Sequence, residues 1–194
     1  ASLLEWEEEV LVANTEGVFA EEKRVRTRLF VLAVAQDGAE VQTGYSAPGK
    51  SVGLELFDLY PPKAVGEKAA RQALTNLKAR PAPAGTFPVV VGPGFGGVLF
   101  HEAVGHLLET TSVARKASVL ADKLGEVVAS PAVTYIDDGT LPHAWGSTEM
   151  DDEGRPTERT VLIERGVLKS YMVDRLGHLL TGYPMTGSGR RQDY

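Results

Sequence analysis

His101, Glu102 and His106 are the residues of this sequence whose types and spacing could carry out hydrolysis. Neutral imidazoles are good zinc ligands, and a carboxylate beside the first imidazole can take a proton from a water molecule that the metal activates. The local sequence is HEAVGH, so the histidines are five positions apart, whereas the common zinc-peptidase helix places them four apart. The pattern predicts a metal-dependent peptidase centre in an irregular helix.

The five-residue spacing requires a distortion of the helix. In a regular α-helix, five steps rotate by about 500°, which leaves the two rings about 140° apart around the axis, too far to share one ion. A single i to i+5 turn, or π-bulge, brings them back to nearly the same face. Gly105 would allow such a turn, so we predict a π-bulge there, with His101 and His106 as metal ligands and Glu102 as general base. The alternative is a buried helix whose histidines are only hydrogen-bonded.

Glu109 is the next candidate, because it follows His106 by three positions. It could serve as a substitute metal ligand. It could equally be an outer carboxylate that holds His106 in position by a hydrogen bond. The sequence leaves both roles open.

A glycine-rich turn supplies the main competing function. Gly92, Gly94 and Gly97 satisfy the G-x-G-x-x-G pattern of dinucleotide-binding domains, after an apolar run at Phe87 to Val91 that we predict to be a buried strand. A dinucleotide-binding unit then needs a second parallel strand ending in an acidic residue about 20 positions on. Residues 110–122 are instead polar and helical in character, so this function ranks below the peptidase.

Periodicity predicts an α+β fold with two antiparallel sheets. The first sheet has a hairpin at Asp37-Gly38 and is followed by an amphipathic helix over Gly66 to Ala79, with Ala70, Leu74 and Leu77 facing the core. The predicted strand at Phe87 to Val91, the helix with the histidines and a second, mainly antiparallel sheet follow. The strands of the two sheets are expected near residues 3–12, 24–35 and 40–45, and near 126–129, 132–136, 161–163 and 167–172.

Composition limits the classes of function. The 194 residues include 20 Lys and Arg against 26 Asp and Glu, for a formal charge of -6. This balance argues against direct binding of nucleic acid, which needs a concentrated positive surface. The chain has no cysteine, which is consistent with a cytoplasmic protein, and no segment reads as a membrane span. We therefore predict a cytoplasmic protein without membrane or nucleic-acid contacts.

Several segments together resemble the TldD/PmbA family of metallopeptidases, on the TldD side. They are GGVLFHEAVGHLLE around the histidines, IDDGT at 136–140, DDEGRPT at 151–157, VLIERGVLKSYM at 161–172 and TGSGRRQDY at 186–194. The resemblance covers most of the chain and is strongest from about Pro83 onward. With the proline-rich linker Arg80 to Gly85, it predicts a central α+β domain at 1–82, truncated at its start, and the first part of the metallopeptidase domain at 83–194.

The resemblance implies a zinc peptidase that acts on unstructured peptides, with one zinc ion per active subunit. It also implies a PmbA-like inactive partner subunit, or self-association, because PmbA-like members lack the metal motif that this chain retains. The third metal ligand of the family is a cysteine in a later segment, so we expect this chain to be a fragment. The alternative within this reading is a noncatalytic peptide-binding or assembly subunit.

Overall fold

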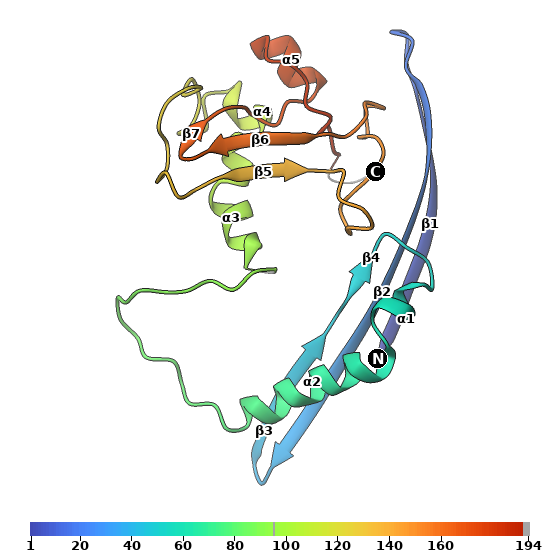
Figure 1. The fold of residues 1–194 in the computed structure, drawn as a ribbon, viewed down its shortest axis with the longest axis vertical. Helices are drawn as coiled ribbons and strands as arrows, with labels where there is room; N and C mark the ends of the chain where they lie inside the picture. The colour runs from blue at the N-terminus through green and yellow to red at the C-terminus, as the bar shows by residue number, and fades with distance from the viewer. Residues whose placement is uncertain (95, 192–194) are drawn as a thin grey trace. The chain divides into compact units, whose positions relative to one another are not determined.

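The computed structural model describes residues 1–94 and 96–191 and has an α+β fold with two antiparallel sheets, which confirms the predicted fold class (Figure 1). Its contacts define two units. Unit 1 comprises Ala1–Val10, Lys23–Phe87 and Pro142–Gly146, and unit 2 comprises Leu11–Glu22, Pro88–Leu141 and Ser147–Tyr194. The boundary between residues 82 and 83 stays a prediction.

The first sheet has the strand order β1-β2-β3, with the short strand β4 also paired to β2. The predicted hairpin at Asp37-Gly38 is present, because Asp37 pairs with Glu40 and Gly38 adopts the positive φ of 58° that a tight turn requires. The strands are β1 (Ser2–Ala13), β2 (Phe19–Asp37), β3 (Glu40–Ser46) and β4 (Gly49–Lys50), followed by the helices α1 (Leu56–Leu59) and α2 (Pro62–Asn76).

Helix α2 is present, but it begins earlier than predicted and buries a different face. Pro62 occupies its first turn, where the missing amide N–H of proline costs nothing. The buried residues are Val65, Ala69 and Ala73. The predicted core stripe was wrong, since Ala70 is exposed, Leu74 is 57% exposed and Leu77 is only half-buried.

Small residues of α2 face the core because this helix lies very close to β3 (Figure 1). A Cβ atom at Gly44 would overlap backbone atoms of α2, so this glycine permits the approach. Two α2 side chains also bond the backbone of β3. Gln72 Oε1 accepts from the Tyr45 N–H at 3.0 Å, and Asn76 Nδ2 donates to the Thr43 carbonyl at 2.8 Å.

The second sheet lies in unit 2 and has the order β5-β6-β7. Both of its pairings are antiparallel, and the predicted turn at Arg165-Gly166 joins β6 to β7 with positive φ angles of 45° and 84°. A core of seven buried residues packs around this sheet: Leu108, Val113, Leu162, Ile163, Leu168, Tyr171 and Val173. The elements of this unit are α3 (Gly97–Ala103), the 3₁₀ helix η1 (Gly105–Leu108), α4 (Thr110–Val113), β5 (Tyr135–Asp138), β6 (Arg159–Glu164), β7 (Val167–Leu168) and α5 (Arg175–Thr181).

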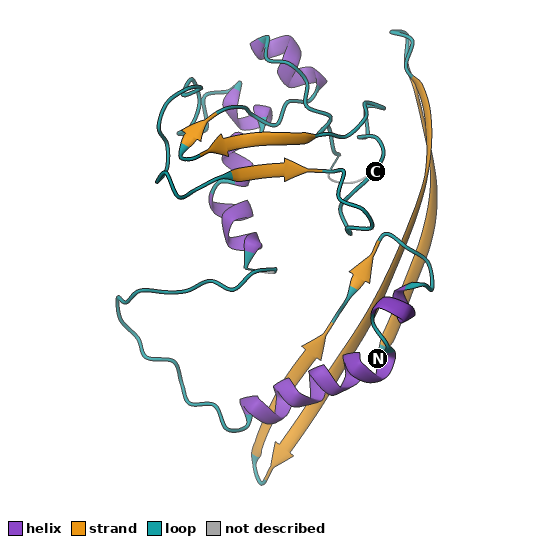
Figure 2. Cartoon of the chain, in the orientation of Figure 1, coloured by secondary structure: helices purple, strands orange, loops and turns teal. Residues whose placement is uncertain are grey.

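The buried strand predicted at Phe87 to Val91 is wrong. Residues 79–94 form neither helix nor strand (Figure 2), and Val89 and Val90 are 72% and 96% exposed. Pro88 has no amide N–H to give to a ladder, and the described residues provide no strand paired with this run. The apolar composition of this run is not sufficient for a strand, because a strand also needs a partner strand to pair with.

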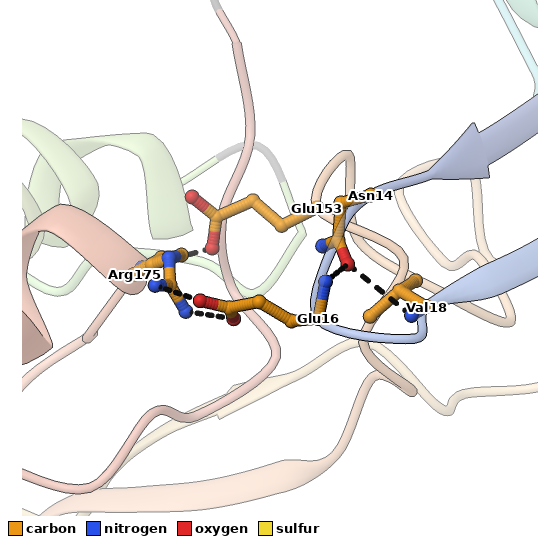
Figure 3. A network of polar contacts seen from close by, with 5 residues as sticks. All are labelled: Asn14, Glu16, Val18, Glu153 and Arg175. Carbon is orange, nitrogen blue, oxygen red and sulfur yellow. Dashed lines mark hydrogen bonds and ion pairs between the residues drawn. The ribbon is translucent and has the colours of Figure 1, made fainter.

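Arg175, at the start of α5, is the centre of a polar network in unit 2 (Figure 3). Its guanidinium forms a two-point ion pair with Glu16, and its backbone N–H donates to Glu153 Oε2 at 2.8 Å. Asn14 shapes the turn that carries Glu16, because its Oδ1 accepts from the N–H groups of Glu16 and Val18. The residues between β1 and β2 are thereby fixed to α5.

Asp151 fixes the last described residues of unit 2. It is 1% exposed, and its Oδ1 accepts from the N–H groups of Glu153 and Arg155 at 3.0 and 2.9 Å. Its Oδ2 accepts from the Gly189 N–H at 3.0 Å. A buried carboxylate with three amide donors is well satisfied and defines the path of the chain on both sides.

Across residues 1–94 and 96–191, every helix is too short or too polar to cross a lipid bilayer.

Candidate metal centre

The helix that carries His101 ends before the chain reaches His106. Helix α3 stops at Ala103, and Val104 adopts φ −133° and ψ −41°, outside helical geometry. The 3₁₀ helix η1 then begins at Gly105 and contains His106. The predicted π-bulge is therefore wrong: a break and a tighter helix turn the second imidazole toward the first.

The two imidazoles are neighbours as a result. The ring centroids of His101 and His106 are 4.5 Å apart, and the ring planes form an angle of 72°. One ligand atom each from His101, Glu102 and His106 lie within 4.8 Å of one another. Two ligands of a tetrahedral zinc ion are about 3.3 Å apart, so side-chain rotations that move the ligand atoms by up to about 1.5 Å complete the approach. This donor set fits a zinc ion.

Glu109 holds His106 by a hydrogen bond. The distance between His106 Nδ1 and Glu109 Oε1 is 2.8 Å, so Nδ1 carries the proton and Nε2 is left for a metal. Glu109 follows the buried residue Leu108, and the Thr110 N–H donates to the Met172 carbonyl at 3.0 Å. The carboxylate is thus attached to a backbone that the core of unit 2 holds in place.

Glu102 faces the other nitrogen of the same ring. Its Oε2 is 3.8 Å from His106 Nε2, beyond hydrogen-bond distance. Its side chain is 66% exposed and that of His106 is 50% exposed. A carboxylate in this position can contact both a metal and a water molecule, and the open surface leaves room for a substrate.

Gly105 leaves space between His101 and Tyr135, a residue of β5 that sequence reasoning did not select. A Cβ atom at Gly105 would be 3.0 Å from the Tyr135 hydroxyl and 3.6 Å from His101 Nδ1. Burial and, to a lesser degree, the charge of Asp137 raise the pKa of Tyr135 above its usual value, so the hydroxyl stays protonated at neutral pH. No local sequence signal near Tyr135 points to the histidines, because the position of its hydroxyl near Gly105 depends on how β5 packs.

The glycine-rich turn does not have the context of a dinucleotide-binding fingerprint. The described residues before Gly92 are irregular where that fingerprint needs a strand, and α3 is only a short helix. Phe95, within the motif, lies outside the described residues. His178, another histidine of unit 2, is bonded through Nδ1 to the Tyr183 carbonyl at 2.7 Å.

Comparison with known proteins places this centre in a family. Residues 84–194 match the family model described as the PmbA/TldA metallopeptidase C-terminal domain. The chain belongs to the TldD/PmbA family. Residues 2–77 also match the central domain of the same metallopeptidases. The resemblance of the sequence to this family is confirmed.

Individual relatives support the assignment. The Metalloprotease TldD homolog of Haemophilus influenzae is 42% identical over 100% of this chain and 41% of its own length. The Zinc metalloprotease TldD homolog of Saccharolobus solfataricus is 29% identical over 86% of this chain and 37% of its own. The crystal structure of TldE from Thermococcus kodakarensis shares the fold, with a TM-score of 0.78 over 98% of this chain and 42% of that one, at 24% identity. The chain thus spans about two fifths of the length of these TldD/PmbA proteins.

Proposed function

We propose that this chain carries the metal-binding part of a zinc-dependent peptidase that hydrolyses unstructured peptides or small unfolded proteins. The observation that carries the proposal is the convergence of His101, Glu102 and His106, whose ligand atoms lie within 4.8 Å of one another. Relatives named as metalloproteases, one of them as a zinc metalloprotease, support the same activity and metal.

Each residue of the group has a separate role. His101 and His106 bind the ion, and His106 does so through Nε2 because its Nδ1–H donates a hydrogen bond to Glu109. When bound, zinc would supply the Lewis acidity that polarises a scissile carbonyl and acidifies a water molecule. Glu102 would accept a proton from the attacking water and return it to the leaving amine, so that one water molecule is consumed for each peptide bond broken.

The exposure of the centre supports the proposed substrate class. Glu102 and His106 are both exposed in the described part of the chain. An extended peptide can place a backbone carbonyl between the imidazoles and the carboxylate, whereas a folded substrate keeps its carbonyls in secondary structure. The family resemblance implies the same preference.

Two parts of the proposal concern groups outside this chain. The sequence contains no cysteine, so the third ligand that the family resemblance implies comes from elsewhere, and Glu109 serves as the carboxylate that orients His106. We also propose that the active protein pairs with a PmbA-like inactive subunit or with itself. Size-exclusion chromatography with light scattering, alone and with a co-expressed partner, tests this pairing.

The deciding experiment separates metal binding from turnover. In the complete gene product, E102Q should bind zinc as the wild type does and lose cleavage of an unstructured peptide, measured by mass spectrometry. H101A and H106A should lose both. E164Q, a change of an exposed glutamate in β6, is the matched control and should retain both. Cleavage by E102Q at the wild-type rate contradicts the role of Glu102.

The same experiment distinguishes the alternative functions. A wild-type protein that binds no zinc but still captures peptides is a noncatalytic binding or assembly subunit. A protein that binds neither zinc nor peptide and does bind a nicotinamide dinucleotide would support the function suggested by the glycine-rich turn.

A further inference from the structure

We propose that Tyr135 is a positioning residue of the metal centre: its hydroxyl accepts a hydrogen bond from His101 Nδ1 and so fixes Nε2 as the nitrogen that His101 presents to the metal. This inference rests on the proposed zinc site and adds a residue to it.

The backbone at Gly105 lies near both polar atoms. The position where a Cβ atom would stand is 3.0 Å from the Tyr135 hydroxyl and 3.6 Å from His101 Nδ1. The two polar atoms therefore border the same small space, which is open because residue 105 is glycine. A modest rotation of the exposed imidazole, or one bridging water molecule, joins them.

Both polar atoms are available for a new hydrogen bond. Within the described residues, neither the Tyr135 hydroxyl nor His101 Nδ1 has a hydrogen-bond partner. The hydroxyl is neutral and can accept as well as donate. A polar atom on a half-buried ring is more stable with a partner than without one, and His101 Nδ1 borders the same space at Gly105 as the hydroxyl does.

His106 already has a hydrogen-bond partner on its second ring nitrogen. Its Nδ1 is engaged by Glu109 at 2.8 Å, which selects Nε2 for the metal. Metal-binding histidines generally need such a partner on the second nitrogen, because it fixes both the tautomer and the ring orientation. For His101, the Tyr135 hydroxyl is the group in position to do this.

The placement of Tyr135 is rigid enough for the role. Tyr135 begins β5, pairs with Ile163 of β6 and packs against the core of unit 2. The hydroxyl is therefore held at a fixed point, while His101 lies on the exposed helix α3. A hydrogen bond to the fixed Tyr135 hydroxyl restricts the imidazole of His101, so this side chain loses less conformational entropy when the metal binds.

The test is zinc affinity, measured by competition with a chelator. Y135F removes only the hydroxyl and should weaken zinc binding by about 10-fold or more, the range expected when the outer partner of a ligand is removed. Y171F is the matched control. Its hydroxyl donates to the Leu120 carbonyl at 2.6 Å within the same core, so its loss should lower stability and leave zinc affinity unchanged.

A spectroscopic readout makes the test independent of activity. Two-bond ¹H–¹⁵N spectra of the complete gene product report the tautomer of each imidazole, and comparison with H101A assigns the signals of His101. In the zinc-bound wild type, His101 should be protonated at Nδ1 and coordinated through Nε2. Coordination through Nδ1, or a zinc affinity of Y135F within twofold of the wild type, overturns the inference.

The two proposals can fail separately. A wild type that binds zinc while Y135F behaves like Y171F contradicts only the role of Tyr135. A wild type that binds no zinc contradicts the proposed function. In that case the metal-free spectra still decide the hydrogen bond, which predicts an Nδ1–H tautomer of His101 that is lost in Y135F.

Discussion

Replacing Glu109 by glutamine tests how much the orientation of His106 contributes to metal binding. The wild-type bond joins His106 Nδ1 to a carboxylate oxygen at 2.8 Å. Hydrogen bonds to charged groups contribute about 1.5–3 kcal/mol when partly buried. Here the two side chains are 50% and 40% exposed, so the lower end of that range applies. Since about 1.4 kcal/mol is tenfold in affinity, E109Q should weaken zinc binding roughly 10-fold.

The assay is a zinc titration against a competing chelator at fixed pH and ionic strength. E164Q is the matched control, because it removes the charge of another exposed glutamate that pairs with a basic group, Lys169 at 3.6 Å, on the second sheet. E164Q should bind zinc like the wild type. The thermal stability of E109Q should stay close to that of the wild type, because a solvent-exposed pair contributes little to folding.

Two results would refute the reasoning. An unchanged zinc affinity in E109Q shows that the bond to His106 does not prepare the site. A change in the number of nitrogen and oxygen ligands in the X-ray absorption spectrum of zinc-loaded E109Q shows that Glu109 is itself a ligand, which is the other role the sequence left open.

Three further substitutions test the fold around the centre. G177A should destabilise unit 2 by several kcal/mol in urea unfolding, because the new Cβ would overlap the buried Thr110 side chain, and a normal midpoint contradicts this packing. D151N should cost about 1–3 kcal/mol by the same measurement, since its NH₂ group would face a backbone donor such as the Gly189 N–H; an unchanged stability would mean that the carboxylate is not the acceptor. Burial, and then the charge of Asp138, raise the pKa of Asp137 above 3.8, so the folded state holds that proton more tightly than the unfolded chain. Its stabilising contribution is present below pH 3.8 and is lost as the pH rises through the folded-state pKa, so D137N should gain stability relative to the wild type as the pH rises above 3.8, and parallel pH profiles would refute this.

The sequence predicted well those features that depend on residues close together in the chain. The hairpin at Asp37-Gly38 and the turn at Arg165-Gly166 follow from the conformational freedom of glycine, and both are present. The HEAVGH segment is similarly local, because its residue types are those of a zinc site and its odd spacing requires a backbone irregularity.

Features that depend on packing could not be predicted in the same way. The irregularity near Gly105 is a helix break where we expected a π-bulge, because both bring the rings together and only the surrounding core decides between them. Helix α2 buries Ala69 where the apolar pattern favoured Leu74, because the close approach to Gly44 leaves no space for a larger side chain. Tyr135 is brought near Gly105 and His101 only by the folded sheet, so no spacing in the sequence could reveal it.

The bonds from Gln72 and Asn76 to β3 have a consequence for the behaviour of unit 1 in solution. A strand at the border of a sheet presents unpaired amide and carbonyl groups, which can recruit a strand from another molecule and start aggregation. In this chain an amide and a carbonyl on β3 are already occupied by α2 side chains. The helix therefore protects this edge strand from pairing with a strand of another molecule. Because the two side chains are uncharged, their hydrogen bonds do not weaken as the salt concentration rises.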